Sequence, residues 1–251
     1  MTTGLAHNGV VRGVYSSESM SSVGFGTTRR RVKQMFFIFV EEQAGEIIEY
    51  QLLNSNFVPS GQKKKITRQE LFKNFVPEPS LFLNTVKPLM RRVNESISLA
   101  DGHREQGRLF SAEFEYKNVL RIDEEHIRAT FGLGLTYFEQ GERHNADLIF
   151  RRLAGLDGAF MPEHKHLFNE FGIQMRKNKM YDQALRYYGK AIRLCKTDEN
   201  LFYNMARVLL ERGRPSKALH FVERSLAVNP DLEASQTLSA IIHKKLKKSN
   251  R

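Results

Sequence analysis

Cysteine is almost absent from this sequence, since one residue, Cys195, stands among 251. A single thiol excludes an intramolecular disulfide and is typical of proteins that work in the reducing cytoplasm. Long apolar runs are also missing: Met35–Val40 has six residues, and about 18 are needed to span a bilayer. The first residues lack the apolar core of a signal peptide. We therefore expect a cytoplasmic protein without a membrane span.

No group of side chains has the spacing of a catalytic or metal site. His164 and His166 lack a third ligand at a helical spacing, so a solvated loop explains them better than a metal. Cys195 has no histidine near it in sequence, which argues against a nucleophile. Gly132 and Gly134 resemble the start of a dinucleotide-binding motif, but its third glycine and preceding strand are missing. We expect no enzyme and no cofactor.

Positive charge is in excess, and its location limits what it means. The net charge is +11. Three basic runs without an acid account for all of this excess, namely Arg29–Lys33, Lys63–Lys65 and Lys244–Arg251. Runs of this kind are usually solvated, and we favour that explanation. A phosphate-binding surface at the N-terminal and C-terminal runs, and with it a nucleic-acid-associated function, stays open as the alternative.

The N-terminal part of the sequence predicts a flexible arm and a small β-rich domain. Residues 1–28 are rich in Gly, Ser and Thr without a sustained period, which indicates an arm with a short docked stretch around Val10–Tyr15. Met35–Val40 has the continuous apolar character of a buried strand, and Ile48–Leu52 alternates between apolar and polar residues. The two segments predict a β-hairpin in a domain of residues 29–78.

A third strand and a short helix should complete this domain. Lys63–Ile66 follows a turn signal and predicts the strand. Thr67 and Glu70 have the spacing of a capping box, so a helix should begin there and cover the sheet. Pro77 and Pro79 end that helix, and we place the domain boundary beside them.

A longer helix is predicted after the boundary. Its apolar residues keep a helical spacing, and they are Phe82, Val86, Leu89, Val93, Ile97 and Ala100. Pro88 interrupts the pattern and should kink the helix or divide it in two.

Four alanines reveal an internal repeat. Ala112, Ala146, Ala184 and Ala218 are separated by 34, 38 and 34 residues. A period of about 34 residues indicates a helix-turn-helix unit that cannot bury its apolar face alone and therefore stacks on its neighbours. Stacked helix pairs form a groove that can hold a peptide, so the repeat favours a binding protein.

Other residues fall around these alanines in the order that a helix pair requires. Gly134 allows close approach of a neighbouring helix, and Gly141 can end the first helix of its pair. The remaining copies carry Leu99, Gly107 and Tyr116; Phe171, Gly172 and Tyr188; and Met205, Ala206, Gly213 and Pro230. This pattern, from residue 93 to 230, resembles the tetratricopeptide repeat. The chain as a whole is similar to bacterial tetratricopeptide repeat proteins with a small N-terminal β-rich domain.

The sequence departs from the family pattern in two places. The favoured tryptophan of the first helix is replaced in the four copies by Ser96, Thr130, Phe168 and Phe202. Four extra residues lie near Gly155–Pro162, where we expect a local distortion of the superhelix.

The resemblance implies that the first helix of each pair lines a concave wall and that this wall binds a peptide. Its residues, carried over copy by copy, are Asp101 and Arg104; Arg128, Phe131, Leu135 and Phe138; Asn169, Ile173 and Arg176; and Asn200, Tyr203, Asn204 and Arg207. Phe131, Leu135 and Phe138 should form an exposed apolar strip. Asn can pair with peptide amides and Arg with a carboxylate.

The sequence thus predicts a mostly α protein, a tetratricopeptide-like helical-hairpin solenoid with a small α+β N-terminal domain. Its parts are an arm (1–28), the β-rich domain (29–78), four repeats with a lead-in helix (79–230), and a capping helix with a basic tail (231–251). The inward residues of the cap are Leu238, Ile241, Ile242 and Leu246. We expect a scaffold or adaptor for another protein or peptide. Self-association, and coverage of the groove by the N-terminal arm, stay open.

Overall fold

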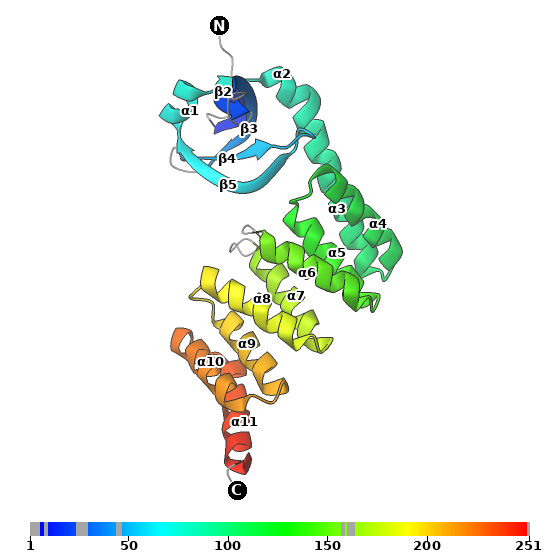
Figure 1. Ribbon diagram of the computed structural model, residues 1–251, viewed down its shortest axis with the longest axis vertical. Coiled ribbons are helices and arrows are strands. Elements are labelled where there is room, and N and C mark those ends of the chain that lie inside the picture. The colour runs from blue at the N-terminus through cyan, green and yellow to red at the C-terminus, as the bar shows by residue number, and fades with distance from the viewer. Residues whose placement is uncertain are drawn as a thin grey trace. The chain divides into compact units, whose positions relative to one another are not determined.

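The structure is a computed structural model and describes residues 6–7, 10–23, 30–43, 47–156, 159 and 164–249 (Figure 1). The chain divides into two compact units. The first contains residues 1–99 with 117–126, and the second contains residues 100–116 with 127–251. The first unit carries the β-sheet, and the second carries most of the helices.

The first unit is built on an antiparallel sheet in the order β1-β2-β3-β4-β5, with β6 paired to β2. The strands are β1 (Ala6–His7), β2 (Val10–Val23), β3 (Arg30–Glu42), β4 (Ile47–Leu53), β5 (Pro59–Thr67) and β6 (Val76–Pro77). The predicted hairpin is confirmed, because Val40 lies opposite Tyr50. The predicted third strand is confirmed as well, as part of β5.

Both faces of β3 are buried at Ile38–Val40, which explains the continuous apolar residues there. Ile38 and Val40 pack on one face with Leu71 of α1 (Arg68–Asn74). Phe39 packs on the other face with Phe82. Successive strand residues point to opposite faces, so a strand covered on both sides needs apolar residues at every position.

Our prediction of a flexible arm was wrong for residues 16–23, and the stretch that we expected to be docked, Val10–Tyr15, lies in the same strand. They form β2, which pairs with β3 from Arg12 opposite Glu41 to Val23 opposite Arg30. The Ser-rich sequence has little strand character of its own, and it is the pairing with the apolar strand β3 that holds it extended. Val10–Tyr15 therefore belongs to the sheet and is no free stretch that could cover a groove. The rest of the expected arm, residues 1–5, 8–9 and 24–28, lies outside the described residues, apart from β1.

The helix that follows β5 begins at the predicted capping box. The Thr67 side chain accepts a hydrogen bond from the Glu70 N–H at 3.2 Å, and the Thr67 N–H donates to the Glu70 carboxylate at 2.9 Å. Two backbone groups at the helix start are satisfied in this way. Leu71 then lies on the buried face of α1.

A π-helical segment lies just before Pro88, where we predicted a kink or a division of the helix. α2 (Pro79–Leu81) continues through η2 (Phe82–Val86) into α3 (Lys87–Glu105). The Lys87 N–H donates to the Phe82 carbonyl, five residues earlier. A proline ring has no N–H and crowds the preceding turn, and a widened turn relieves that crowding.

The helices after the lead-in segment form four consecutive pairs and a final helix, as the repeat predicts. The remaining helices are α4 (Leu109–Ile122), α5 (Ile127–Glu139), α6 (Arg143–Gly155), α7 (Lys165–Lys177), α8 (Tyr181–Leu194), α9 (Glu199–Glu211), α10 (Pro215–Val228) and α11 (Glu233–Ser249). Ala112, Ala146, Ala184 and Ala218 lie in the second helix of each pair and are fully buried. Small residues at these positions let the helices of the stack pack closely.

In each helix pair the turn contains one residue with a left-handed backbone conformation, at an equivalent position. Gly107, Gly141 and Gly213 have positive φ, and Lys179 takes this role in the third copy with a φ of 60°. The residue after each of them donates its N–H to a carbonyl five residues earlier, as Glu142 does to Tyr137. These bonds satisfy carbonyl groups that the helix end leaves free.

The last helix covers the fourth pair. Leu238 and Ile242 of α11 are buried, and Leu246 is half-buried. Ile241, which we expected to face inward, is exposed. The hydroxyls of Ser225 and Ser235 are 2.8 Å apart and join α10 to α11. The distortion that we expected near the four extra residues falls on 157–158 and 160–163, which lie outside the described residues.

Candidate functional site

The predicted concave wall does not expose its apolar strip. Phe131, Leu135 and Phe138 are on α5, as expected, but their exposed fractions are 0%, 1% and 5%. The rings of Phe131 and Phe138 pack on Phe171 of α7, with centroids 5.7 and 5.2 Å apart. Gly134 leaves room for the Phe171 ring. These side chains are thus core between neighbouring repeats, and the prediction of an exposed strip was wrong.

The arginines of the wall form ion pairs between repeats. Arg104 lies 2.7 Å from Glu139 and 3.6 Å from Glu170, and Arg176 lies 2.5 Å from Glu211. Burial alone would lower the pKa of Arg104, but the two carboxylates outweigh it and raise that pKa. Both guanidinium groups are therefore engaged by carboxylates of this chain before any ligand arrives.

Asp101 is also satisfied within the wall. It accepts a short hydrogen bond from the Tyr116 hydroxyl and pairs with Arg128 at 2.6 Å. Burial raises the pKa of Tyr116, and the hydrogen bond to the carboxylate adds to this effect. The tyrosine stays a hydrogen-bond donor, which fixes Asp101 against α4. Arg128 remains more than half exposed.

The other wall residues divide between packing and a small hollow. Asn204 is buried and donates to the Asn169 amide oxygen at 3.2 Å, and Asn200 donates to Glu199 at 3.1 Å. Ile173 is half-buried. Tyr203 and Arg207 line a hollow of about 230 Å³ beside α11, with further lining by Leu210, Glu211, Ala234, Thr237, Leu238 and Ile241. The wall thus presents scattered polar groups and no continuous apolar surface.

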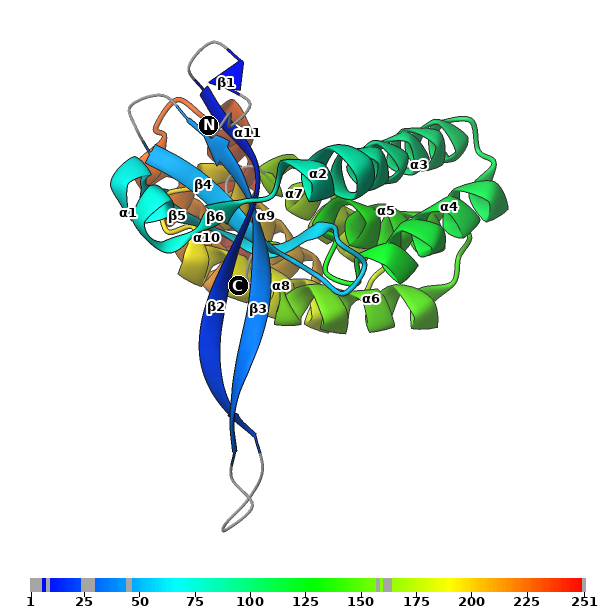
Figure 2. The ribbon, with the colours of Figure 1, turned by 90° about the horizontal axis from the view of Figure 1, so that it is seen from above.

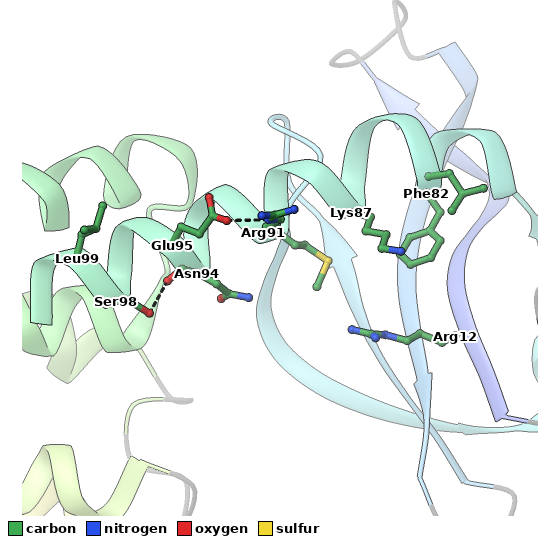
Figure 3. Close-up of a pocket in the computed structure, with 10 residues that line it drawn as sticks. Arg12, Phe82, Lys87, Arg91, Asn94, Glu95, Ser98 and Leu99 are labelled. Atoms are coloured by element: carbon green, nitrogen blue, oxygen red, sulfur yellow. Dashed lines mark hydrogen bonds and ion pairs between the residues drawn. The ribbon is translucent and has the colours of Figure 1, made fainter. Parts of the chain in front are cut away.

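A second hollow, which we call the α3 groove, lies in the first unit (Figure 3). Its volume is about 1190 Å³. It is lined by Arg12, Phe82, Leu83, Lys87, Met90, Arg91, Asn94, Glu95, Ser98 and Leu99. These come from β2, η2 and α3, so a strand forms one side and a continuous helical segment forms the other.

The sheet side of the groove is held by packing and charge. The Phe82 ring lies 6.0 Å from the Phe39 ring of β3, measured between centroids. The Arg12 guanidinium lies 5.8 Å from the centroid of the same Phe39 ring and pairs with Glu41 at 3.1 Å. Arg12 is thereby fixed at the groove edge.

The helical side presents apolar side chains to solvent. Leu83, Lys87, Met90 and Asn94 recur every three to four residues and share one face of the helix. Leu83 is 44% exposed, and Leu99 at the far end is 56% exposed. Exposed leucines that share a groove mark a place where another apolar surface can be buried.

The rim of the groove carries charged side chains, most of which are paired. Arg91 and Glu95 form an ion pair at 2.7 Å, drawn as a dashed line in Figure 3. In the described part of the chain Lys87 has no carboxylate partner. Arg12 is paired with Glu41 and Arg91 with Glu95, so Lys87 is the cation of this rim that is left to meet a negatively charged group of a ligand.

Sequence reasoning missed this groove because it followed only the buried stripe of the helix. Phe82, Val86 and Val93 are buried, as predicted. Leu83 and Met90 form a second apolar row beside that stripe, and this row was the available signal. The row lines a groove only because β2 lies close to it, and the sequence predicts an arm for these residues.

Within the described residues, no three side chains of the His, Cys, Asp and Glu types cluster closely enough to hold a metal ion. A helix with the length and apolar character of a membrane span is likewise lacking there.

Comparison with known proteins agrees with this fold. Residues 175–242 match the family model described as tetratricopeptide repeat. Anaphase-promoting complex subunit 3 of Schizosaccharomyces pombe is 29% identical over 152 residues, which are 58% of this chain and 22% of that protein. TPR repeat-containing protein YpiA of Bacillus subtilis is 26% identical over 149 residues, which are 57% of this chain and 34% of that protein. The chain thus spans about a fifth and a third of these two relatives.

A solved structure supports the same fold. PilF of Pseudomonas aeruginosa superposes with a TM-score of 0.50 at 21% identity, covering 63% of this chain and 70% of that one. Residues 175–242 therefore match the tetratricopeptide repeat, and the superposition shows a helical-repeat fold of the same kind.

Proposed function

We propose that this tetratricopeptide repeat protein is a scaffold or adaptor that binds a segment of another protein in the α3 groove. The observation that carries the proposal is the groove itself, a hollow of about 1190 Å³ with exposed Leu83 and Leu99, a partly buried Met90 and the cation Lys87 in its lining. Apolar side chains supply most of the affinity of such sites, and charge at the rim orients the ligand. The occupant is an amphipathic segment that has apolar and acidic residues on the same side.

The length of the groove suits a helical ligand. Residues 83 to 99 of the continuous helical segment span roughly 24 Å at about 1.5 Å per residue. A partner helix of four turns has similar length and can lay its apolar face in a groove of this kind. Acidic residues at its edge would then face Lys87 and Arg91.

The concave wall is the weaker candidate for this role. Its aromatic residues are packed between repeats, and Arg104 and Arg176 are paired within the chain. Arg128, Tyr203 and Arg207 are among its accessible groups, and the hollow beside Tyr203 is small. In this proposal they form a second contact surface. This surface discriminates among the partners that bind in the α3 groove.

The named relatives support a role in assembly without identifying the partner. The Schizosaccharomyces pombe protein is by name a subunit of a complex, and this chain matches 22% of it. The single cysteine is in keeping with a cytoplasmic location for such an assembly.

The test is capture of partners by the full-length tagged chain. Leu83→Glu with Met90→Glu should reduce the captured partner at least about tenfold, because both changes place charge in a surface that must desolvate. The matched control is Leu148→Glu with Leu194→Glu, which alters two exposed leucines of α6 and α8 outside the groove. The control should capture as the unaltered chain does.

Arg128→Ala with Tyr203→Ala separates the two surfaces. If this variant loses the partner and the groove variant keeps it, the site is the concave wall and the groove proposal is wrong. Sedimentation velocity of the unaltered chain shows whether the captured partner includes a second copy of this chain.

A further inference from the structure

The strands β2 and β3 continue past the rest of their sheet as a two-stranded ribbon. Figure 2 shows the two strands side by side, extending away from β4 and β5. The pairing defines the ribbon as Ser17–Val23 with Arg30–Phe36. β6 pairs with β2 at Ser16 and before it, and β4 pairs with β3 from Ile38 onward. Both edges of the ribbon are therefore without a neighbouring strand in the described part of this unit.

The base of the ribbon is anchored in the core of the first unit. Tyr15 lies opposite Ile38, and both are buried in the cluster that contains Leu71. Below this point the strands cannot separate without exposing that cluster. The ribbon is thus a supported extension of a packed sheet, although an isolated two-stranded hairpin is only marginally stable in water.

The ribbon carries an excess of positive charge on one strand. Arg30, Arg31 and Lys33 stand on β3, and the one acid of the ribbon, Glu18, pairs with Lys33 at 2.9 Å. Arg30 and Lys33 are exposed. On the facing strand Met20 lies opposite Lys33, and Ser17 and Ser19 lie opposite Phe36 and Gln34. Arginine and lysine side chains are among the groups that contact phosphate oxygens.

We propose that this ribbon enters the major groove of duplex DNA. Two paired strands lie about 4.8 Å apart, and the major groove of B-form DNA, about 12 Å wide, admits a two-stranded β-ribbon. Seven residue pairs extend the ribbon by roughly 23 Å, about two-thirds of a helical turn of DNA. Arg30 and Lys33 lie on opposite faces of the ribbon, and their long side chains can reach phosphates at the groove edges. This activity is separate from the protein-binding function proposed above.

The exposed apolar side chains of the ribbon fit the same ligand. Met20, Val32 and Met35 are 64%, 45% and 55% exposed. Met20 and Met35 share one face of the ribbon and Val32 is on the other, and apolar side chains on the face that enters the major groove can meet the methyl groups of thymine. The major groove of A-form RNA is deep and narrow, so the same ribbon cannot enter it.

The experiment measures binding of the full-length chain to a labelled 20-base-pair duplex by fluorescence anisotropy. Three phosphate contacts predict that affinity falls roughly 40-fold between about 50 and 200 mM salt. The ribbon variant Arg30→Ser, Arg31→Ser, Lys33→Ser should lose most of this affinity and nearly all of its salt dependence. Duplex RNA of the same sequence should bind at least about tenfold more weakly.

The control removes the same amount of charge elsewhere. Lys244→Ser, Lys247→Ser, Lys248→Ser alters three exposed lysines of α11, and this variant should bind DNA as the unaltered chain does. Thermal melts of both variants confirm folding. If both variants lose DNA affinity equally, bulk charge explains the binding and the proposal is overturned. It is also overturned if the ribbon variant binds normally, if duplex RNA binds as tightly as DNA, or if no duplex binds at low salt.

Discussion

Gly134 on α5 lies directly against Phe171 on α7, so closely that a Cβ atom at residue 134 would be 2.3 Å from Cε2 of the ring. The same Cβ atom would be 2.8 Å from Ile149 of α6. The absence of a side chain thus lets three helices of two neighbouring repeats meet at one point. The repeat stack is positioned by contacts of this kind.

Gly134→Ala should therefore destabilise the stack, although alanine favours helix more than glycine does. Overpacking of a tight site costs about 1 to 3 kcal/mol, and the melting temperature should fall by several degrees. Gly102→Ala is the control, because a Cβ atom there meets no atom within 4 Å. It should leave the melt unchanged or raise it slightly. If the two variants have the same melting temperature, close packing at Gly134 does not determine stability.

Two phenylalanines of the helical unit, one buried and one exposed, allow the contribution of packing to stability to be measured. Phe131 is fully buried and Phe110 is 79% exposed. Phe131→Ala should lower the free energy of unfolding by about 3 to 5 kcal/mol, because it leaves a cavity beside Phe171. Phe110→Ala should change it by less than about 0.5 kcal/mol. Urea denaturation measures both. A small effect at Phe131 would instead support the exposed strip that the sequence predicted.

The ion pair between Arg176 and Glu211 should be a measurable coupling between repeats. Arg176 is mostly buried, which reduces screening by water. A double-mutant cycle with Arg176→Met and Glu211→Gln should give a coupling energy of about 1 kcal/mol. The exposed pair Arg91–Glu95 on α3 is the reference and should give about 0.3 to 0.5 kcal/mol. A coupling at Arg176 no larger than this reference contradicts a structural role.

The thiol of Cys195 should react slowly in the folded protein. Burial raises the pKa of Cys195, and the nearby Asp198 carboxylate raises it further, while Lys165 opposes them. Near pH 8 the folded protein then holds less thiolate than the unfolded chain, and the thiolate is the reactive form. Alkylation by iodoacetamide should be slower than in denaturant after correction for exposure.

Asp198→Asn tests the electrostatic part of this prediction. Asparagine can still accept the hydrogen bonds that Asp198 receives from Asn200 and Leu201 at the start of α9. The loss of charge should lower the thiol pKa and speed alkylation. Asp231→Asn, an exposed acid at another turn, should leave the rate unchanged. The prediction is wrong if the pH dependence of alkylation is the same in both variants.

The last helix should be required for solubility, and its basic end should not be. A chain that ends after Leu246 keeps Leu238 and Ile242, which are buried against the fourth pair. A chain that ends before Asp231 exposes that surface and leaves Ser225 without its hydroxyl neighbour on α11. The longer truncation product should melt close to the full chain, and the shorter one should aggregate. Equal behaviour in size-exclusion chromatography would contradict a capping role for α11.

The sequence by itself determined the features that depend on local or periodic physics. The capping box at Thr67, the left-handed glycines at Gly107, Gly141 and Gly213 and the buried alanines follow from backbone geometry and from the volume available between packed helices. A repeat also predicts its own contacts, because every copy meets a neighbour like itself. The helix pairs and the hairpin of β3 and β4 were predictable for these reasons.

Only the tertiary structure decided which of these surfaces stay exposed. The Ser-rich residues of β2 are extended because β3 pairs with them, and no local signal encodes that pairing. Phe131 is buried because Phe171, forty residues later, fills the space beside Gly134. Leu83 lies in a groove because β2, which is about seventy residues earlier in the sequence, forms the other side of it. Burial and exposure depend on partners distant in the sequence, so the site could be placed only once the pairing and packing were known.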